Sequence, residues 1–406
     1  MILLELLFYL LMSLLTKRLV LLLATLLLLL PGSIGIDRIV GHFLPPLGPG
    51  LVLPPNVTVE MNTSEFSSIV HTNSMGFRDR EFTTQKSAQT RIVAIGDSFT
   101  FGWGVQDAES WPKVLENRLR ESGLNVELAN LGKPGGSPAN YAEIAENALP
   151  LLHPDLVIVG VLQGDDVAQM GIPSRESKDE NADYADVKST HRALHRLMKL
   201  LYPNLLRIVD HSHVGSSQLT PDWTALAQTS LAAFTPAEKK RFDELDADVK
   251  KAFFAGELNP SLVYLAIRIP DYFMETMNLD SDVTRNHISQ TAEQLKRIKA
   301  AADRNDTRVI VVSVPYGIYV SAASWATRKR IAFNTTPEML SSSNPDDAIK
   351  QASQLAGIDF CEVTKQFRKA SINQQLFFEL DGHFNRKGHA LFAESVAPVI
   401  RDLLPN

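Results

Sequence analysis

From residue 91 to the end of the chain, hydrophobic positions follow two patterns, short apolar runs typical of strands and the wider spacing typical of helices. Short apolar runs predict strands at 91–95, 126–129, 156–161 and 308–314, with a weaker one at 357–362. Apolar residues at helical spacing predict helices at 111–122, 139–149, 288–302 and 387–404. Strongly apolar strands that alternate with helices are typical of a parallel sheet covered on both faces. We therefore expect one doubly wound α/β domain.

This order is interrupted between residues 168 and 282, a stretch rich in helix-forming residues. A capping-box pattern at 235–238 predicts a helix that runs to about residue 254. Residues 261–277 are more apolar and predict a packed helix that is broken or kinked near Pro270. We interpret the stretch as a helical insertion, which acts either as a lid over an acyl or glycan pocket or as a stabilising appendage.

The N-terminal part of the chain is far more apolar than the rest. Apolar residues dominate 1–15 and 19–30, and Lys17 and Arg18 separate the two runs. This pattern predicts a membrane-targeting segment. Because no small-residue cleavage site is evident after Pro31, we expect an uncleaved anchor with the basic pair on the cytoplasmic side and the remaining chain extracytoplasmic. Secretion after signal cleavage is the alternative.

The segment between this signal and the α/β pattern has its own composition. Dense Pro and Gly over 41–55 predict an irregular linker, and alternation over 57–70 predicts extended structure. The predicted organisation is a membrane segment or signal sequence (1–36), a linker and extended leader (37–90), an α/β domain (91–167 and 283–406) and a helical insertion (168–282).

Charge and composition exclude some function classes. The 40 Lys plus Arg against 46 Asp plus Glu give a net charge of −6, which offers no reason to expect a nucleic-acid partner. The single cysteine, Cys361, cannot form an internal disulfide, and we expect a buried thiol. His191 with His195, and His211 with His213, have metal-like spacing but lack an evident third ligand, so we expect no metal and no cofactor.

Residues with chemical potential follow the predicted strands at their carboxyl ends, where open α/β sheets bind ligands. Ser98 follows the first strand in a Gly-Asp-Ser sequence and is either a nucleophile or a helix N-cap. Gly135 follows the second strand, where glycine permits backbone N–H groups to face an oxyanion or simply forms a turn. Asp165 follows the third strand, in a sequence that in isolation predicts a solvated loop. Asp381, two residues before His383, can orient an imidazole beside a serine nucleophile.

In this order, the four elements resemble the SGNH (GDSL) hydrolase superfamily over about residues 91–404, without the insertion. The resemblance implies a flavodoxin-like three-layer α/β/α domain and serine esterase or acyl-transfer chemistry. It implies that Ser98 is the nucleophile and that His383 and Asp381 complete its triad. Residues 73–78 also resemble a segment that precedes the catalytic block in many extracytoplasmic members.

The same resemblance implies an oxyanion hole and exposes two departures from the family pattern. The hole would contain the backbone N–H groups of Ser98 and Gly135, together with Asp165 at the position of the family's asparagine. A carboxyl group donates a hydrogen bond only when protonated, so otherwise Gln163 or backbone groups would have to serve. The second departure is the Asp-x-His spacing, which replaces the commoner Asp-x-x-His and is associated with polysaccharide-acetylation relatives. We expect His389, in the last helix, to be structural.

The sequence thus predicts a metal-independent serine esterase at the cell envelope. Its substrate would be an acyl ester, O-acetyl or another carboxylic ester, on a carbohydrate or lipid. An O-acyltransferase on cell-envelope polysaccharide would use the same residues, with a sugar hydroxyl in place of water. A non-catalytic binding protein on the same scaffold is a third possibility, which Asp165 favours and the intact triad of Ser98, Asp381 and His383 disfavours.

Overall fold

The computed structural model divides the chain into two units, Met1–Leu47 with Asp179–Val214 and Gly48–Lys178 with Gly215–Asn406. It describes residues 17–18, 29–41, 53, 55–83, 85–86, 88–172, 198, 201–202, 204–205 and 222–404. Most of the predicted membrane segment, and both histidine pairs with metal-like spacing, lie outside these residues. Within them, no helix combines the length and apolar character needed to cross a membrane.

In the first unit, residues 29–41 form a helix. Its buried Asp37 accepts hydrogen bonds from the backbone N–H of Leu205 at 2.8 Å and from Nδ2 of Asn204 at 3.1 Å. These two contacts satisfy the carboxylate, as a buried charge requires.

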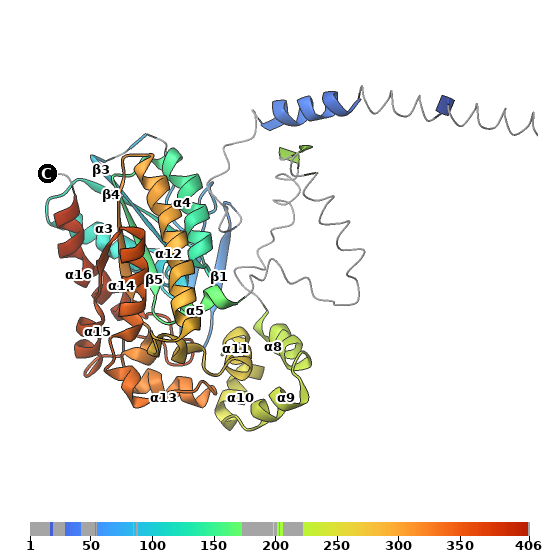
Figure 1. Cartoon of the computed structure of the whole chain (residues 1–406), viewed down its shortest axis with the longest axis vertical. Coiled ribbons are helices and arrows are strands. Elements are labelled where there is room, and N and C mark those ends of the chain that lie inside the picture. The colour runs from blue at the N-terminus through green and yellow to red at the C-terminus, as the bar shows by residue number, and fades with distance from the viewer. Residues whose placement is uncertain are drawn as a thin grey trace, which may run out of the picture. The chain divides into compact units, whose positions relative to one another are not determined.

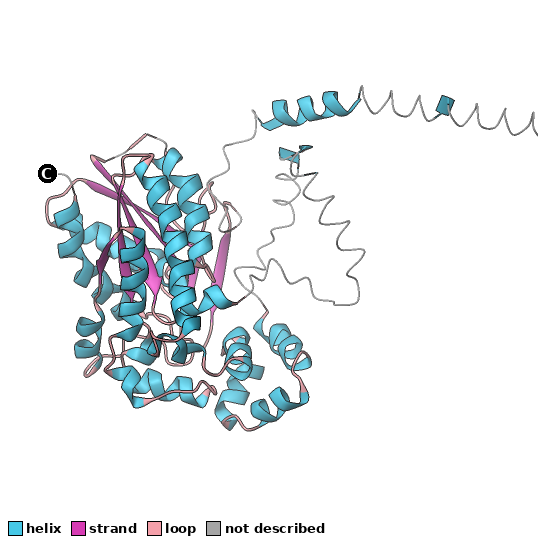
Figure 2. Ribbon diagram, viewed as in Figure 1, coloured by secondary structure: helices cyan, strands magenta, loops and turns pink. Residues whose placement is uncertain are grey.

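A five-stranded parallel sheet forms the centre of the second unit (Figures 1 and 2). Its strands are β3 (Thr90–Gly96), β4 (Val126–Gly132), β5 (Leu156–Leu162), β6 (Arg308–Val314) and β7 (Asp359–Cys361). They lie in the order β4-β3-β5-β6-β7, which is the flavodoxin-like arrangement, and the predicted α/β fold is therefore confirmed. Because the order reverses between β3 and β5, the ligand crevice is expected at the carboxyl ends of these two strands.

Helices cover both faces of the sheet (Figure 1). They are α2 (Ser98–Phe101), α3 (Trp111–Glu121), α4 (Pro138–Leu152), α5 (Asp165–Ala168), α12 (Asp282–Asp303), α13 (Ala322–Arg330), α14 (Asn344–Ala356), α15 (Thr364–Ser371) and α16 (Arg386–Leu403). Short 3-10 helices occupy Asp107–Glu109, Gln169–Gly171, Tyr272–Met277, Gly317–Tyr319 and Pro337–Leu340. Helices α3 and α16 cover one face, and α4, α12 and α14 cover the other.

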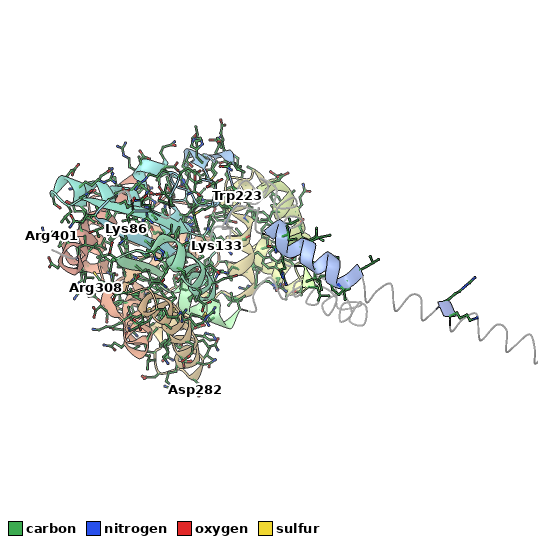
Figure 3. All side chains as sticks on the ribbon, turned by 90° about the horizontal axis from the view of Figure 1, so that it is seen from above. Lys86, Lys133, Trp223, Asp282, Arg308 and Arg401 are labelled. Atoms are coloured by element: carbon green, nitrogen blue, oxygen red, sulfur yellow. The ribbon has the colours of Figure 1, made fainter. Side chains whose placement is uncertain are left out.

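Alternate side chains of each strand enter different cores, as the pleat of a strand requires. In β3, Ile92 joins the core that contains Trp111 of α3, whereas Val93 joins the core that contains Tyr141 of α4. The core that contains Trp111 also contains Phe392, Val396 and Ile400 of α16, so it holds this helix against the sheet. Arg308, at the start of β6, donates to the carbonyl of Leu403 at 2.7 Å. Figure 3 shows Arg308 and Arg401 on the same side of the second unit.

The insertion contributes four helices that group with the sheet in the same unit. They are α8 (Trp223–Ala232), α9 (Pro236–Asp243), α10 (Ala247–Phe254) and α11 (Pro260–Arg268). The prediction of one continuous helix to about residue 254 is wrong, because α9 ends at Asp243 and Asp246 caps a separate helix, α10, by accepting from the N–H of Asp248 at 3.3 Å. The predicted break near Pro270 is confirmed. The predicted insertion limits remain a prediction.

The leader contains an antiparallel hairpin, formed by β1 (Thr58–Asn62) and β2 (Ser67–His71). This confirms the extended structure that its alternation predicts. Each strand buries every second residue, so the hairpin packs on the domain through one face.

Candidate active site

Ser98, His383 and Asp381 form a chain of hydrogen bonds at the carboxyl edge of the sheet. Nε2 of His383 lies 2.7 Å from Oγ of Ser98, and Nδ1 lies 2.5 Å from Oδ1 of Asp381. Ser98 is the first residue of α2, and its N-cap is Asp97, which accepts from the N–H of Phe99 at 2.9 Å. The alternative in which Ser98 caps the helix is therefore wrong, and the serine hydroxyl faces the imidazole instead.

Close backbone packing presents Ser98 at this edge. Helix α2 has only four residues and ends at Gly102, whose φ of +88° lets the chain turn away. A Cβ atom at Gly132, the last residue of β4, would collide with the backbone of Phe101. Glycine at this position therefore allows α2 to lie directly against β4.

The loop that carries Asp381 and His383 is similarly constrained. Gly382 between them has a φ of +90°, and a Cβ there would collide with the guanidinium of Arg328. Oδ1 of Asp381 also accepts from the backbone N–H of His383 at 3.1 Å. The same carboxylate oxygen thus fixes both the imidazole and the backbone of His383.

Asp381 is held in its ionised form. Burial acts to raise the pKa of this carboxyl, but the charge and hydrogen bonds of His383 outweigh it and lower the pKa below the usual value. Oδ2 accepts from Nε1 of Trp103 at 3.2 Å. An ionised carboxylate with both oxygens occupied is suited to stabilise an imidazolium during proton transfer.

Three more carboxyl groups, Asp97, Asp165 and Asp166, lie close enough to interact electrostatically. Asp165 accepts from the hydroxyl of Tyr272 at 2.9 Å, and Asp166 accepts from the hydroxyl of Tyr141 at 2.9 Å. Burial raises the pKa of all three carboxyls, and the negative charge of Asp165 adds to the effect on Asp97 and Asp166. The pKa of Asp97 rises to about 7. The prediction of a solvated loop after β5 is therefore wrong.

Donors for an oxyanion are present beside Ser98. Gly96 and Gly132 pair in the sheet, which places the turn that contains Gly135 next to α2. Gly135 has a φ of +66°, and in the described part of the chain neither its N–H nor that of Ser98 has a hydrogen-bond partner. These two groups are free to bind a developing negative charge.

The side-chain donors at this site differ in availability. The amide of Gln163 donates to Asp346 at 2.6 Å and to Thr364 at 2.7 Å, so it offers no free hydrogen to an oxyanion. Burial raises the pKa of the half-buried Asp165, which widens the pH range over which this carboxyl holds a proton and can donate. Asp165 lies close enough to Asp97 and His383 to interact with them electrostatically.

Sequence reasoning missed three residues that shape the site: Trp103, Arg328 and Glu65. Trp103 stands between two glycines just after the nucleophile, a pattern that marks an aromatic residue at a tight turn. Arg328 donates to the carbonyls of the two residues that precede Gly382, and Glu65 accepts from backbone N–H groups of the same loop. Neither Arg328 nor Glu65 stands in a recognisable motif, since each binds backbone atoms of residues far away in the sequence.

His389 and Cys361 lie apart from this chemistry. His389 is fully buried in the first turn of α16, where Nδ1 accepts from the N–H of Trp111 at 3.2 Å. Burial lowers its pKa to about 3, so it is a neutral structural group, as predicted. Cys361 is half-buried rather than fully buried, and burial raises the pKa of its thiol to about 11. No cluster of three metal-binding side chains occurs within the described residues.

Comparisons with known proteins agree with this geometry. A family model described as GDSL-like lipase/acylhydrolase matches residues 92–396. No curated protein sequence matches the chain.

Several solved structures are similar at low identity. An alpha/beta hydrolase enzyme from the metagenome of Lake Arreo, Spain, is 14% identical, with a TM-score of 0.37, over 80% of this chain and 100% of its own. A lipase/acylhydrolase from Enterococcus faecalis is 11% identical, with a TM-score of 0.37, over 78% and 98%. A mutant of an acetyl-xylooligosaccharide esterase from Geobacillus Stearmophilus is 11% identical, with a TM-score of 0.37, over 79% and 97%.

With TM-scores below 0.5, these structures say nothing about the substrate of this chain. The family match covers well over half of the chain and includes both Ser98 and His383. The chain belongs to the GDSL-like lipase/acylhydrolase family and is a serine hydrolase that acts on ester substrates.

Proposed function

We propose that Ser98, His383 and Asp381 are the catalytic triad of this esterase. The observation that carries the proposal is the continuous chain of hydrogen bonds, 2.7 Å from Ser98 to His383 and 2.5 Å from His383 to Asp381. Its geometry is that of a nucleophile, a base that can accept its proton, and a carboxylate that orients the base.

In the proposed mechanism, Nε2 of His383 takes the proton of Ser98 as Oγ bonds to the ester carbonyl carbon. The tetrahedral intermediate collapses when His383 returns the proton to the leaving alcohol oxygen. This leaves an acyl group on Ser98. A water molecule, deprotonated by His383, attacks the acyl-enzyme, and the carboxylic acid leaves as Ser98 regains its proton. Asp381 stays ionised throughout and stabilises the imidazolium form of His383.

The proposed oxyanion hole consists of the N–H groups of Ser98 and Gly135 and, at pH values where it holds a proton, the carboxyl of Asp165. The two N–H groups lack partners in the described part of the chain, and the raised pKa of Asp165 supports its donor role. Removing one such donor typically lowers kcat by about 10²–10³-fold.

The proposed substrate is an acyl ester on a carbohydrate or lipid of the cell envelope. The apolar residues 1–30, interrupted by the basic pair at 17–18, support a membrane-anchored enzyme whose catalytic domain is extracytoplasmic. Such an enzyme meets envelope polymers and lipids directly. Release of acetate from an acetylated glycan by the full chain tests this substrate class, and transfer of the acetyl group to a sugar hydroxyl instead would identify an acyltransferase.

A fluorophosphonate probe tests the nucleophile itself. Ser98 is expected to form a covalent adduct that mass spectrometry locates on the peptide containing residue 98. The adduct should be absent in Ser98→Ala and present in Ser324→Ala, a control serine on α13 that hydrogen-bonds to Ser321. An adduct on another serine, or none on the folded full chain, would contradict the proposal.

A further inference from the structure

The loop that carries Asp381 is bound by a carboxylate from the leader. Glu65 accepts hydrogen bonds from three successive backbone N–H groups, those of Glu379 at 2.6 Å, Leu380 at 3.0 Å and Asp381 at 2.8 Å. Both carboxylate oxygens take part, because the N–H of Leu380 lies 3.0 Å from each. Charge-assisted bonds of this kind are about twice as strong as neutral ones.

A guanidinium holds the carbonyl groups of the same loop. Arg328 donates to the carbonyl of Leu380 at 2.8 Å and to that of Asp381 at 2.9 Å. The hydroxyl of Tyr316 accepts from its Nε at 3.0 Å, which fixes the guanidinium plane. The backbone at residue 381 is therefore bound on its N–H by a carboxylate and on its carbonyl by a cation.

The turn that presents Glu65 is itself well ordered by local contacts. Oγ1 of Thr63 accepts from the N–H groups of Glu65 at 3.1 Å and Phe66 at 3.3 Å. The ring of Phe66 packs against Phe378, with 5.0 Å between the ring centroids. The N–H of Ser64 donates to the carboxylate of Glu257, between α10 and α11, at 2.5 Å. The turn between β1 and β2 thus joins the catalytic loop to the insertion.

We propose that Glu65 is a positioning residue that holds Asp381 in reach of His383. The proposal rests on the triad proposed above. Glu65 precedes residues 92–396, the part of the chain that the family model matches, so the leader completes an active site that the family domain alone would leave loose. Its effect on catalysis passes through Asp381, since it contacts backbone atoms and neither the serine nor the imidazole.

Removal of this carboxylate leaves three N–H groups without their acceptor and frees the loop. A displacement of about 1 Å at a catalytic group can cost about 10²-fold in rate, so Glu65→Ala is expected to lower kcat by about 10²-fold with little change in KM. Glu65→Gln keeps the size of the side chain but offers one acceptor oxygen where the glutamate uses two. We expect its kcat to lie between those of the alanine variant and the unchanged chain.

Hydrolysis of p-nitrophenyl acetate by the full chain provides the test, with Glu81→Ala as the matched control. Glu81 is also a leader carboxylate that binds a backbone N–H, that of Ser74 at 2.7 Å, but it does not contact the catalytic loop. It should leave kcat unchanged. The double variant Glu65→Ala/Asp381→Asn separates positioning from general destabilisation, because a residue that acts only through Asp381 adds little to its loss.

The expected result has two parts. First, Glu65→Ala shifts the acidic limb of the pH profile of kcat/KM in the same direction as Asp381→Asn does. Second, the kcat of the double variant lies within about twofold of that of Asp381→Asn. The proposal would be overturned if Glu65→Ala lowered kcat by the same factor in the unchanged chain and in Asp381→Asn. Unchanged kcat in both Glu65→Ala and Glu65→Gln would also overturn it. If the alanine variant does not fold, Glu65→Gln carries the same comparison. Unchanged activity in Asp381→Asn would instead overturn the triad.

Discussion

Nε1 of Trp103 donates a hydrogen bond to Oδ2 of Asp381 over 3.2 Å, while Oδ1 of the same carboxylate binds His383. Trp103, two residues beyond the end of α2, thus binds the carboxylate at the far end of the triad. The Trp103 ring also lies 5.8 Å from the imidazole ring of His383, between centroids. The position of Asp381 is therefore determined from the serine side of the site as well as from its own loop.

Loss of the indole N–H in Trp103→Phe should weaken this hold. A hydrogen bond to a charged group contributes about 1.5–3 kcal/mol, so we expect kcat/KM for p-nitrophenyl acetate to fall by roughly 10-fold or more. Trp325→Phe is the control, because Nε1 of Trp325 donates to the carbonyl of Thr336, away from the triad. Equal activity of both variants would show that the indole bond does not support catalysis.

Asp165 makes the oxyanion hole sensitive to pH. Burial raises the pKa of this carboxyl, and only the protonated form donates to an oxyanion, so activity should fall as the pH rises through that pKa. Asparagine donates at every pH, and Asp165→Asn should therefore retain activity on the alkaline side. The measurement is the kcat/KM profile from roughly pH 5 to pH 9.

Asp271→Asn is the matched control for this profile, since Asp271 binds the side chain of Asn334 and does not face the triad. It should leave the alkaline limb in place. If Asp165→Asn leaves the alkaline limb unchanged, the limb comes from another group and Asp165 is not part of the oxyanion hole.

Asp97 should make the stability of the fold depend on pH. Its pKa is raised from 3.8 to about 7 by burial and by the charge of Asp165, so the folded state holds a proton that the unfolded state releases. The resulting stabilisation is complete below about pH 4 and is lost as the pH rises through about 7.

Asp97→Asn removes this titration and keeps an oxygen that can cap α2. The change of Tm between roughly pH 5 and pH 8 should be smaller in this variant than in the unchanged chain. Asp222, the exposed N-cap of α8, provides the control, and Asp222→Asn should keep the original dependence. If Tm changes with pH in Asp97→Asn as much as in the unchanged chain, the carboxyl of Asp97 does not titrate in the folded state between those pH values.

The strands could be predicted from local pattern, whereas the catalytic chemistry was implied by the resemblance of four motifs to the SGNH family. Five apolar runs correspond to the five parallel strands, and the resemblance to the SGNH family implies the pairing of Ser98 with His383 that their 2.7 Å contact shows. The break at Asp246 was missed, since its side chain caps α10 inside a stretch that otherwise has helical spacing. Glu65 and Arg328 could not be found, because backbone-binding side chains leave no pattern at their partners' positions.

The leader was predicted to resemble a segment that accompanies the catalytic block, and the structure supplies a physical reason for such a segment. Arg78 is almost fully buried and donates to the carbonyls of Gly102 and Val105, in the turn that follows the nucleophile. Its Nε binds Asp107. A guanidinium that binds several carbonyls of one turn fixes the backbone just beyond Ser98.

Arg78→Lys retains the charge but cannot reach these carbonyls together. We expect the free energy of unfolding to fall by about 3 kcal/mol, as for the loss of part of a buried charged network. Urea denaturation measures it. Arg118→Lys, at an exposed arginine whose nearest carboxylate is 3.8 Å away, is the control and should change stability by less than about 0.5 kcal/mol. Equal stabilities of the two variants would contradict this role for Arg78.

Hydrolysis of p-nitrophenyl acetate by the full chain and by Ser98→Ala tests the central claim most directly. The account predicts measurable turnover by the unchanged chain and a loss of about 10³-fold or more in Ser98→Ala, with the melting temperature preserved. His383→Ala should be equally impaired, because the two side chains act as one unit. Turnover by Ser98→Ala at the rate of the unchanged chain would contradict the assignment of Ser98 as the nucleophile.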